Sequence, residues 1–487
     1  MSTTINTSTS SVPQTQPVVS VAGSSSGAAG GSVINVSSLV SQLVAATEAP
    51  QQSLIANQTQ QVTTQISALG QLKGALSSFQ SSLSALDTAS AFQQEVANSA
   101  SPGVFTATAG NGAPTGTYNV AVTALATAQQ LLSNPVTGST IGTGTLQLSL
   151  GGTSFSVTID GTNDTLAGLA AAINTASGNP GIAATVLQGT DGAHLLLSSS
   201  QTGAANTIQV AETDGGNALA ALTYSSGSTN YIQEAGAQDA AFSISGVNFT
   251  SPTNSVSNAM NGVTLNLLGL SPTSGTPPVA TPATLSISND TTTIANNIQS
   301  FVSAYNGLQS TISSLGGFTA SSNTAGPLMG DAALQGIQGQ IQQALYSIVN
   351  TGSSTYNTLA SIGITTNSDG SLSVNSGTLS AALSSNFSAV NQLFSSTSGV
   401  AATLNNDITQ ALGTNGAITA EGNTFTSQEN SLTQQSNQLQ TRMAALSASL
   451  TQQYSALNAL LSSLQSTSSY LTQQFNTLPQ VQGKANA

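Results

Sequence analysis

The C-terminal end of the chain, from about Ser427 to Leu478, carries the feature that most constrains the fold. Apolar side chains recur there in steps of three and four, the spacing of a helix that packs along a partner helix. No Gly or Pro interrupts the run, which predicts one helix of roughly 75 Å at about 1.5 Å per residue. A helix of that length cannot cover its apolar face within its own fold, so it needs a partner. The predicted seam consists of Leu439, Leu446, Leu450, Tyr454, Leu457, Leu461, Leu464, Leu471 and Phe475.

A second stripe with helical spacing lies near the other end of the chain, after a Pro50 that marks a break or the first position of a helix. We predict that the two terminal helices are partners. On periodicity alone, they fit an ordinary helical bundle as well as a coiled stalk that assembles with other copies or other proteins. The seam residues predicted on this second helix are Val62, Ile66, Leu69, Leu76 and Leu83.

Charged residues are scarce: 3 are basic and 16 acidic, and together they make up 4% of the chain against a usual ~25%. Lys73, Arg442 and Lys484 cannot neutralise a phosphate backbone, which excludes nucleic-acid binding. They give anionic lipid equally little to attract. The chain has no Cys, so it uses no disulfides and fits either a reducing compartment or an exported protein stabilised by packing.

Residues 1–32 are rich in Ser, Thr, Gly, Ala and Gln and contain no Lys or Arg. We expect this segment to be disordered. It lacks the charged start and apolar middle of a secretory signal peptide. No run in the chain approaches the ~18 apolar residues of a membrane span. If the protein leaves the cell, we expect a route that needs no cleaved signal.

The hydrophobic period changes from 3.6 to 2 near Gly103 and returns to 3.6 at Asp290. Between these points we predict many short strands, beginning with 104–108 and 118–122 around a Gly and Pro turn, and one helix at 165–174. After residue 290, we predict helices at about 294–312 and 334–348, capped by Asp290 and Asp331, and further helices at about 379–394 and 400–412. We also predict a hairpin at 362–374 around an Asp-Gly turn. The predicted fold class is α+β: a helical trunk built from both chain ends, with terminal coiled-coil helices and two β-rich domains inserted in the middle.

No residue constellation predicts catalysis, a cofactor or a metal site. His194 is the only imidazole and lies in an apolar run, where a cross-strand histidine is expected. The segment 160–164 has the oxygen ligands of a calcium loop but lacks the spacing and closing Glu of an EF-hand. We interpret it as a turn followed by a helix cap, with Asp164 or Thr165 as the cap.

Several stretches resemble the flagellar filament cap protein family, also called hook-associated protein 2. They occur in the family's order and span about residues 33–480. The most specific is the segment 116–133, GTYNVAVTALATAQQLLS. The others are LVSQL at 39–43 followed by Glu48 and Pro50, FVSAYN at 301–306, GPLMGD at 326–331, and LASIGI at 359–364 followed by GSL at 370–372.

The resemblance implies a secreted structural protein at the tip of the bacterial flagellar filament, exported through the flagellar type III channel and not an enzyme. Its implied divisions are a disordered segment (1–32), N-terminal leg and trunk helices (33–100), an inner head domain in two parts (101–137 and 237–289), an outer head domain (138–236), a helical trunk with a hairpin (290–426) and a C-terminal leg helix (427–487).

The resemblance also implies a ring-like homo-oligomer of about four to six copies that promotes insertion and polymerisation of flagellin. Further implied partners are the hook–filament junction proteins and, before secretion, an export chaperone. Two alternatives stay open at this point. One is a related axial protein, either a flagellin or a junction protein. The other is a surface adhesin, because the chain is rich in Ser and Thr, β-rich and acidic.

Overall fold

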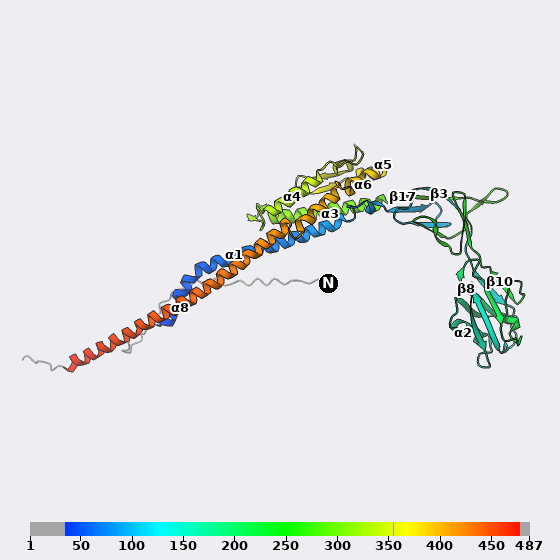
Figure 1. Cartoon of the computed structure of the whole chain (residues 1–487), viewed down its shortest axis with the longest axis horizontal. Coiled ribbons are helices and arrows are strands. Elements are labelled where there is room, and N and C mark those ends of the chain that lie inside the picture. The colour runs from blue at the N-terminus through cyan, green and yellow to red at the C-terminus, as the bar shows by residue number, and fades with distance from the viewer. Residues whose placement is uncertain (1–34, 354, 478–487) are drawn as a thin grey trace, which may run out of the picture. The chain divides into compact units, whose positions relative to one another are not determined.

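The computed structural model describes residues 35–353 and 355–477. Packing divides the chain into two compact units. The first unit contains the described residues 35–64 and 424–477, and the second runs from Gln65 to Asn423. Two long helices, α1 (Val36–Leu83) and α8 (Ala417–Thr477), contribute residues to both units. Helical ends around a β-rich middle confirm the predicted α+β class (Figure 1).

Both terminal helices differ in extent from the prediction. Pro50 lies inside α1, so the predicted break is wrong: the buried residues Val40 and Val62 on either side of it hold the helix together although the proline removes one backbone N–H. At the other end, α8 begins at Ala417, well before Ser427. It includes Gly422, where a Cβ would lie 3.3 Å from Leu69 Cδ2. Glycine therefore lets α8 approach α1 closely in the second unit.

The helical part of the second unit combines segments from both sides of the β-rich middle. Its remaining helices and hairpins are η1 (Ala89–Phe92), α3 (Thr291–Gly316), β18 (Phe318–Thr319) with β19 (Thr324–Ala325), α4 (Ala332–Leu345), η3 (Ala360–Ile362), β20 (Ile364–Thr366) with β21 (Leu372–Val374), α5 (Ser376–Ser385), α6 (Phe387–Ser395) and α7 (Val400–Leu412). The predicted hairpin at 362–374 corresponds to β20 and β21 and is confirmed.

Aromatic side chains form the centre of this helical core. The ring of Phe79 on α1 lies 5.8 Å from that of Phe301 and 6.0 Å from that of Tyr305, both on α3. Phe301 in turn lies 6.0 Å from Phe394 on α6. The helix predicted over 379–394 is divided into α5 and α6, because the Asn386 side chain accepts a hydrogen bond from the Ala389 N–H and starts a new helix.

One β-rich part of the second unit contains two antiparallel sheets around one core. The five-stranded sheet has the order β1 (Glu95–Ser99), β17 (Ala283–Asn289), β3 (Gly116–Ala124), β11 (Ala240–Ile244), β12 (Val247–Ser251). The three-stranded sheet has the order β13 (Ser255–Met260), β14 (Val263–Leu267), β2 (Phe105–Ala109), and a short pair joins β15 (Thr273–Ser274) to β16 (Val279–Ala280). The two strands predicted around the first turn, β2 and β3, therefore belong to different sheets.

Another β-rich part of the second unit has its own core, formed by two antiparallel sheets and one helix. The four-stranded sheet has the order β10 (Tyr231–Ala235), β4 (Ala128–Ser133), β8 (Ala193–Thr202), β7 (Ile182–Gln188). The three-stranded sheet has the order β6 (Thr153–Ile159), β5 (Gly144–Leu150), β9 (Ile208–Glu212), and the short η2 spans Ala220–Leu222. Helix α2 (Leu166–Thr175) packs on β7 (Figure 1). Thr165 caps it by accepting a hydrogen bond from the Gly168 N–H.

Carboxylates at helix starts and in turns accept hydrogen bonds from backbone N–H groups. Asp290 accepts from the Thr293 N–H at 2.9 Å and from its hydroxyl at 2.6 Å. Asp331 accepts from the Leu334 N–H at 2.8 Å. Both residues cap helices, as the sequence predicts. The two hydrogen bonds from Thr293 hold the pKa of Asp290 below its usual value, because they favour the ionised form.

The cap of α3 makes part of the stability dependent on pH. At neutral pH, Asp290→Ala should lower the free energy of unfolding by about 1 kcal/mol. Because the folded-state pKa is lowered, the contribution of the carboxylate is complete above the unfolded value of about 3.9 and is lost as pH falls through the folded pKa. The measurement is thermal unfolding followed at 222 nm. Asp290→Asn keeps the cap without a charge and should not show this pH dependence.

Candidate assembly surface

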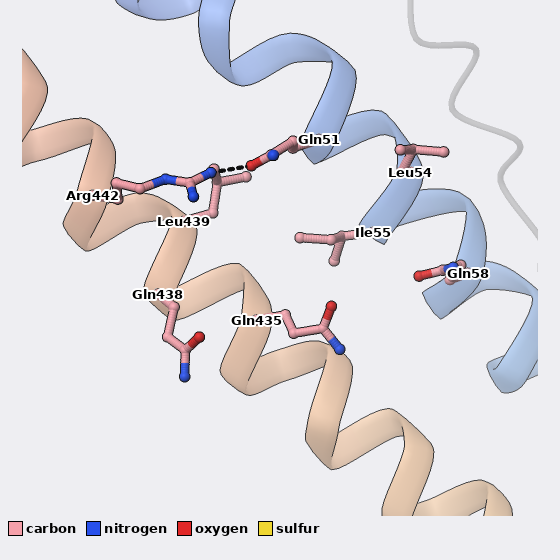
Figure 2. A pocket seen from close by; sticks show the side chains of 8 residues that line it. All are labelled: Gln51, Leu54, Ile55, Gln58, Gln435, Gln438, Leu439 and Arg442. Atoms are coloured by element: carbon pink, nitrogen blue, oxygen red, sulfur yellow. Dashed lines mark hydrogen bonds between the residues drawn. The ribbon is translucent and has the colours of Figure 1, made fainter.

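In the first unit, α1 and α8 run antiparallel and contact each other through a narrow apolar line. The guanidinium of Arg442 on α8 donates a hydrogen bond to the Gln51 side-chain oxygen on α1. Nearby, Ile55 is directed from α1 toward α8 beside Leu439 (Figure 2). The side chains of Val62, Leu432, Leu439 and Met443 are buried. This pairing gives the first unit its stability.

A groove follows each side of this apolar line. The first groove has a volume of about 460 Å³, and half of its lining residues carry amide side chains, namely Gln51, Gln58, Gln435 and Gln438 (Figure 2). Leu54, on its rim, is 62% exposed. The second groove has a similar volume of about 460 Å³ and shares Ile55 and Leu439 with the first. Two helices alone therefore leave apolar and amide groups open to further contacts on both sides.

The predicted N-terminal seam is covered by the chain itself. Val62 is buried in the first unit, and Ile66 is half-buried in the second. Leu69, Leu76 and Leu83 are buried in the second unit. Phe79, between them in sequence, contacts α3. These side chains stabilise the folded chain and are not open to another copy.

The predicted C-terminal seam divides into covered and uncovered parts. Leu439 is buried, and Leu446, Leu450 and Tyr454 are half-buried. From Leu457 onward every predicted seam residue is exposed, from 41% at Leu461 to 71% at Phe475. We define the tail as Leu457–Thr477 of α8. The tail stripe consists of Leu457, Leu460, Leu461, Leu464, Leu471 and Phe475.

The register of the pair explains where the exposure begins. Gln51 contacts Arg442, and Val36, the first residue of α1, lies as far before Gln51 as Leu457 lies after Arg442. An antiparallel pair with equal rise per residue therefore places Val36 opposite Leu457. Beyond Leu457, the described part of α1 offers no partner. In Figure 1 the red end of α8 continues past the start of α1.

Sequence reasoning missed Leu54 and Leu460 as exposed apolar residues. It followed only the seam positions, and both residues are direct chain neighbours of residues on the apolar line, Ile55 and Leu461. Their type was the available signal, because each is a leucine on a polar helix. In a pair of helices such flanking positions stay at the surface, and they gain importance only when more helices assemble.

The tail is also free of charge. No Asp, Glu, Lys, Arg or His occurs from Met443 to Thr477, so contact with the tail stripe would depend on apolar burial and amide hydrogen bonds. Such contacts respond little to salt. This absence of charge distinguishes the surface from coiled coils that select partners through charged flanking positions.

His194 and the loop at 160–164, which the sequence analysis considered for their chemistry, lie outside this surface. His194 lies in β8, with Nδ1 2.7 Å from the Ser133 carbonyl oxygen and Nε2 3.1 Å from Asp191 Oδ1. These two contacts raise the pKa of His194. In the loop at 160–164, Asp160 accepts hydrogen bonds from the backbone and hydroxyl of Thr162, as in a turn.

Within 35–353 and 355–477, no group of three or more His, Cys, Asp or Glu residues is arranged to hold a metal ion. In the same part of the chain, no helix has both the length and the apolar character needed to cross a membrane.

Comparison with family models gives three matches along the chain. Residues 32–129 match the flagellar hook-associated protein 2 N-terminus, and residues 237–466 match the C-terminus of the same family. Residues 145–201, which include β6, α2 and β7 and most of β5 and β8, match the flagellin hook IN motif.

Individual relatives match over nearly the whole chain. Flagellar hook-associated protein 2 of Escherichia coli is 35% identical over 466 residues, covering 91% of this chain and 97% of its own length. B-type flagellar hook-associated protein 2 of Pseudomonas aeruginosa is 29% identical over 468 residues, covering 92% and 96%. The crystal structure of the flagellar cap protein FliD D1-D2-D3 domains from Escherichia coli is similar with a TM-score of 0.55 and 31% identity, covering 74% of this chain and 99% of that one.

Helical chain ends with an uncovered apolar stripe, around a β-rich middle, define a structural protein that acts by assembling with other chains. The comparisons identify it as a component of the bacterial flagellum. The chain belongs to the flagellar hook-associated protein 2 family. This membership confirms the predicted family, filament-cap function and flagellar location, and it favours the cap over the flagellin, junction-protein and adhesin alternatives.

Two leucines on the same face of α8 test the division between covered and uncovered seam. Leu439 is 6% exposed and Leu464 is 58% exposed. Leu439→Ala should destabilise the α1–α8 pair by about 2 kcal/mol, because a buried side chain is truncated. The stability of the α1–α8 pair in Leu464→Ala should stay within about 0.5 kcal/mol of that in the parent protein. Hydrogen exchange of the backbone amides at 50–60 measures both; equal effects would contradict the division.

Proposed function

We propose that this protein forms a closed homo-oligomer at the distal end of the flagellar filament and promotes the insertion and polymerisation of exported flagellin. The observation that carries the proposal is the tail stripe: an apolar face that the described part of the chain does not cover. An apolar surface of this kind on an exported protein is suited to contact with other chains. The proposed action requires binding and release, and no catalysis.

The domain divisions of the sequence analysis belong to this proposal. The first unit, with α1 and α8, would form the leg that contacts axial chains. The helical part of the second unit would form the trunk, and the β-rich domains would form the head. Separate cores in the two β-rich domains, one within 131–231 and one within 105–126 and 240–287, support a head made of two parts.

The predicted partners also belong here. Flagellin and the hook–filament junction proteins would meet the leg, and an export chaperone would bind the chain before secretion. The tail stripe suits each of these roles, because helices with apolar seams are common contacts in assemblies of this kind. A homo-oligomer of about four to six copies stays our expectation for the ring.

A charge in the tail stripe should abolish capping. Leu457→Asp or Leu461→Asp would require burial of an unpaired carboxylate wherever the stripe contacts a partner chain. Cells with either variant should shed unpolymerised flagellin, measured by immunoblot of the culture medium, while circular dichroism shows the β-rich domains still folded. Ser455→Asp adds the same charge on the opposite face of α8 and should leave filaments normal. Normal filaments with Leu457→Asp would contradict the leg assignment.

The oligomer should be insensitive to salt. Among the described residues, the one ion pair joins His194 to Asp191 within the same chain, so ionic strength has little to screen. The mass of the purified oligomer, measured by light scattering, should be unchanged between about 0.05 M and about 1 M NaCl. Dissociation at the higher concentration would show that charge holds the copies together.

A further inference from the structure

We propose that residues 17–22 of the chain cover the first groove and the exposed Leu54 on its rim until the first unit meets another chain. The segment would lie extended along α1, and residues 23–35 would connect it to the start of that helix. This proposal rests on the proposed function only in treating the groove as a surface that other chains contact. Its evidence is an uncovered leucine face on α1 and the sequence that precedes the helix.

The large apolar side chains exposed on α1 form one leucine face. They are Leu39, Leu43 and Leu54, which are 38%, 40% and 62% exposed. At about 100° per residue, the three fall within about 60° of one another around the helix. The leucine face adjoins the first groove, because Leu54 is also one of the residues that line it. An uncovered apolar path therefore runs from near the first residue of α1 to the groove.

Side-chain amides in the groove are available to a peptide backbone. The amides of Gln58 and Gln438 make no hydrogen bond to any other residue that the structure describes. Each can donate to a peptide carbonyl and accept from a peptide N–H. Arg442 is the one charged residue in the lining, and its guanidinium already donates to Gln51. The groove therefore suits an uncharged, extended segment whose apolar side chains can cover Leu54.

Residues 17–22, with the sequence PVVSVA, have this character. No Asp, Glu, Lys or Arg occurs in residues 1–34. The valines at 18, 19 and 21 favour an extended backbone, because they branch at Cβ. Alternate side chains of an extended chain share one face, so Pro17, Val19 and Val21 would lie together against the leucine face. Ser20 would lie on the opposite face of the segment.

The connection has the length that this arrangement needs. Leu54 lies about 27 Å along α1 from Val36, at about 1.5 Å per residue. Residues 23–35 contain four Gly and four Ser, and a flexible chain of that composition and length spans about 20 Å on average. Fully extended, the same chain spans at most about 45 Å. The groove is therefore within reach of residues 17–22.

The connection also favours this segment over the same segment of a second copy. A short flexible linker holds its two ends at an effective concentration of about 1 mM. At about 1 μM protein, residues 17–22 of another copy are about a thousand times more dilute. The segment of the same chain is therefore the first to cover the leucine face, which keeps that apolar surface from other contacts before assembly.

Cysteine cross-linking of the full-length protein tests the proposal, because the chain has no Cys of its own. Ser20→Cys/Gln58→Cys places one thiol on the segment and one in the first groove. The matched control is Ser20→Cys/Gln60→Cys, because Gln60 lines the second groove and points about 160° away around α1. Both glutamines are exposed, and the two tethers have nearly equal length. With a short bis-maleimide, we expect the intrachain link to form at least about tenfold faster in the Gln58 variant.

Loss of the apolar contacts should remove this preference. Leu54→Ser, added to the Gln58 variant, should lower the rate of linking to within about twofold of the control. Leu54 is exposed, so the α1–α8 pair should stay folded, as circular dichroism at 222 nm measures. Val19→Ser/Val21→Ser should have the same effect and changes no residue that the structure describes. An unchanged preference in both variants would show that apolar contacts do not hold the segment.

Three further results would overturn the proposal. Equal rates in the Gln58 and Gln60 variants would show that residues 17–22 are tethered near α1 but do not lie in the groove. Covalent dimers in place of the intrachain link, separated by denaturing electrophoresis, would assign the groove to a second copy. A photo-reactive maleimide on Gln58→Cys that labels added flagellin, with no intrachain link in the double variant, would assign the groove to flagellin.

The cross-linking assay uses purified protein without filaments, so its outcome is separate from that of the capping assay. A failed intrachain link with normal capping in the parent protein would overturn the cover alone. Leu457 and Ser455 do not line the first groove. Shed flagellin from Leu457→Asp with no effect of Ser455→Asp would therefore support the leg whatever the cross-linking result.

Discussion

The pairing of α1 with α8 is the interaction on which the rest of the first unit depends. Helices with a single apolar face are stable in water when a second helix covers that face. Here Val40, Val62, Leu439 and Met443 are covered in this way, and the contact of Gln51 with Arg442 fixes the register. The first residue of the described α1, Val36, lies opposite Leu457. The apolar face of α8 is therefore covered only as far as Leu457. The unequal extent of two helices thus produces an apolar surface without any specialised motif.

Cationic side chains are scarce in the second unit as well. With few ion pairs available, its stability comes from apolar and aromatic packing, as in the contacts of Phe79, Phe301 and Phe394. Several carboxylates instead accept hydrogen bonds from backbone N–H groups, as Asp290 and Asp331 do at helix starts and Asp160 and Asp369 do in turns. Glu95 accepts from the Gly112 N–H, and Asp239 accepts from the Ala204 N–H. Acidic residues in this protein therefore organise the backbone more than they pair with cations.

Prediction from the sequence succeeded where the signal was local. The position of Asp290 and Asp331 before an apolar period predicts that both cap helices, and the Asp-Gly turn predicts the hairpin of β20 and β21. Prediction failed where distant packing decides. The break expected at Pro50 does not occur, because buried residues on both sides hold α1 together. The strands β2 and β3 are neighbours in the chain but pair in different sheets, because their partners β14 and β17 come from much later in the sequence.

The sequence by itself determined that both chain ends are long amphipathic helices, that the middle is β-rich, and that the seam near the C-terminus carries no charge. These properties are written in residue type and spacing, which act over one or two turns of a helix. Only the tertiary structure decided which part of each seam is covered. Leu69 and Leu464 have the same local pattern, yet one is buried and the other exposed, because coverage depends on where a helix from the other end of the chain begins.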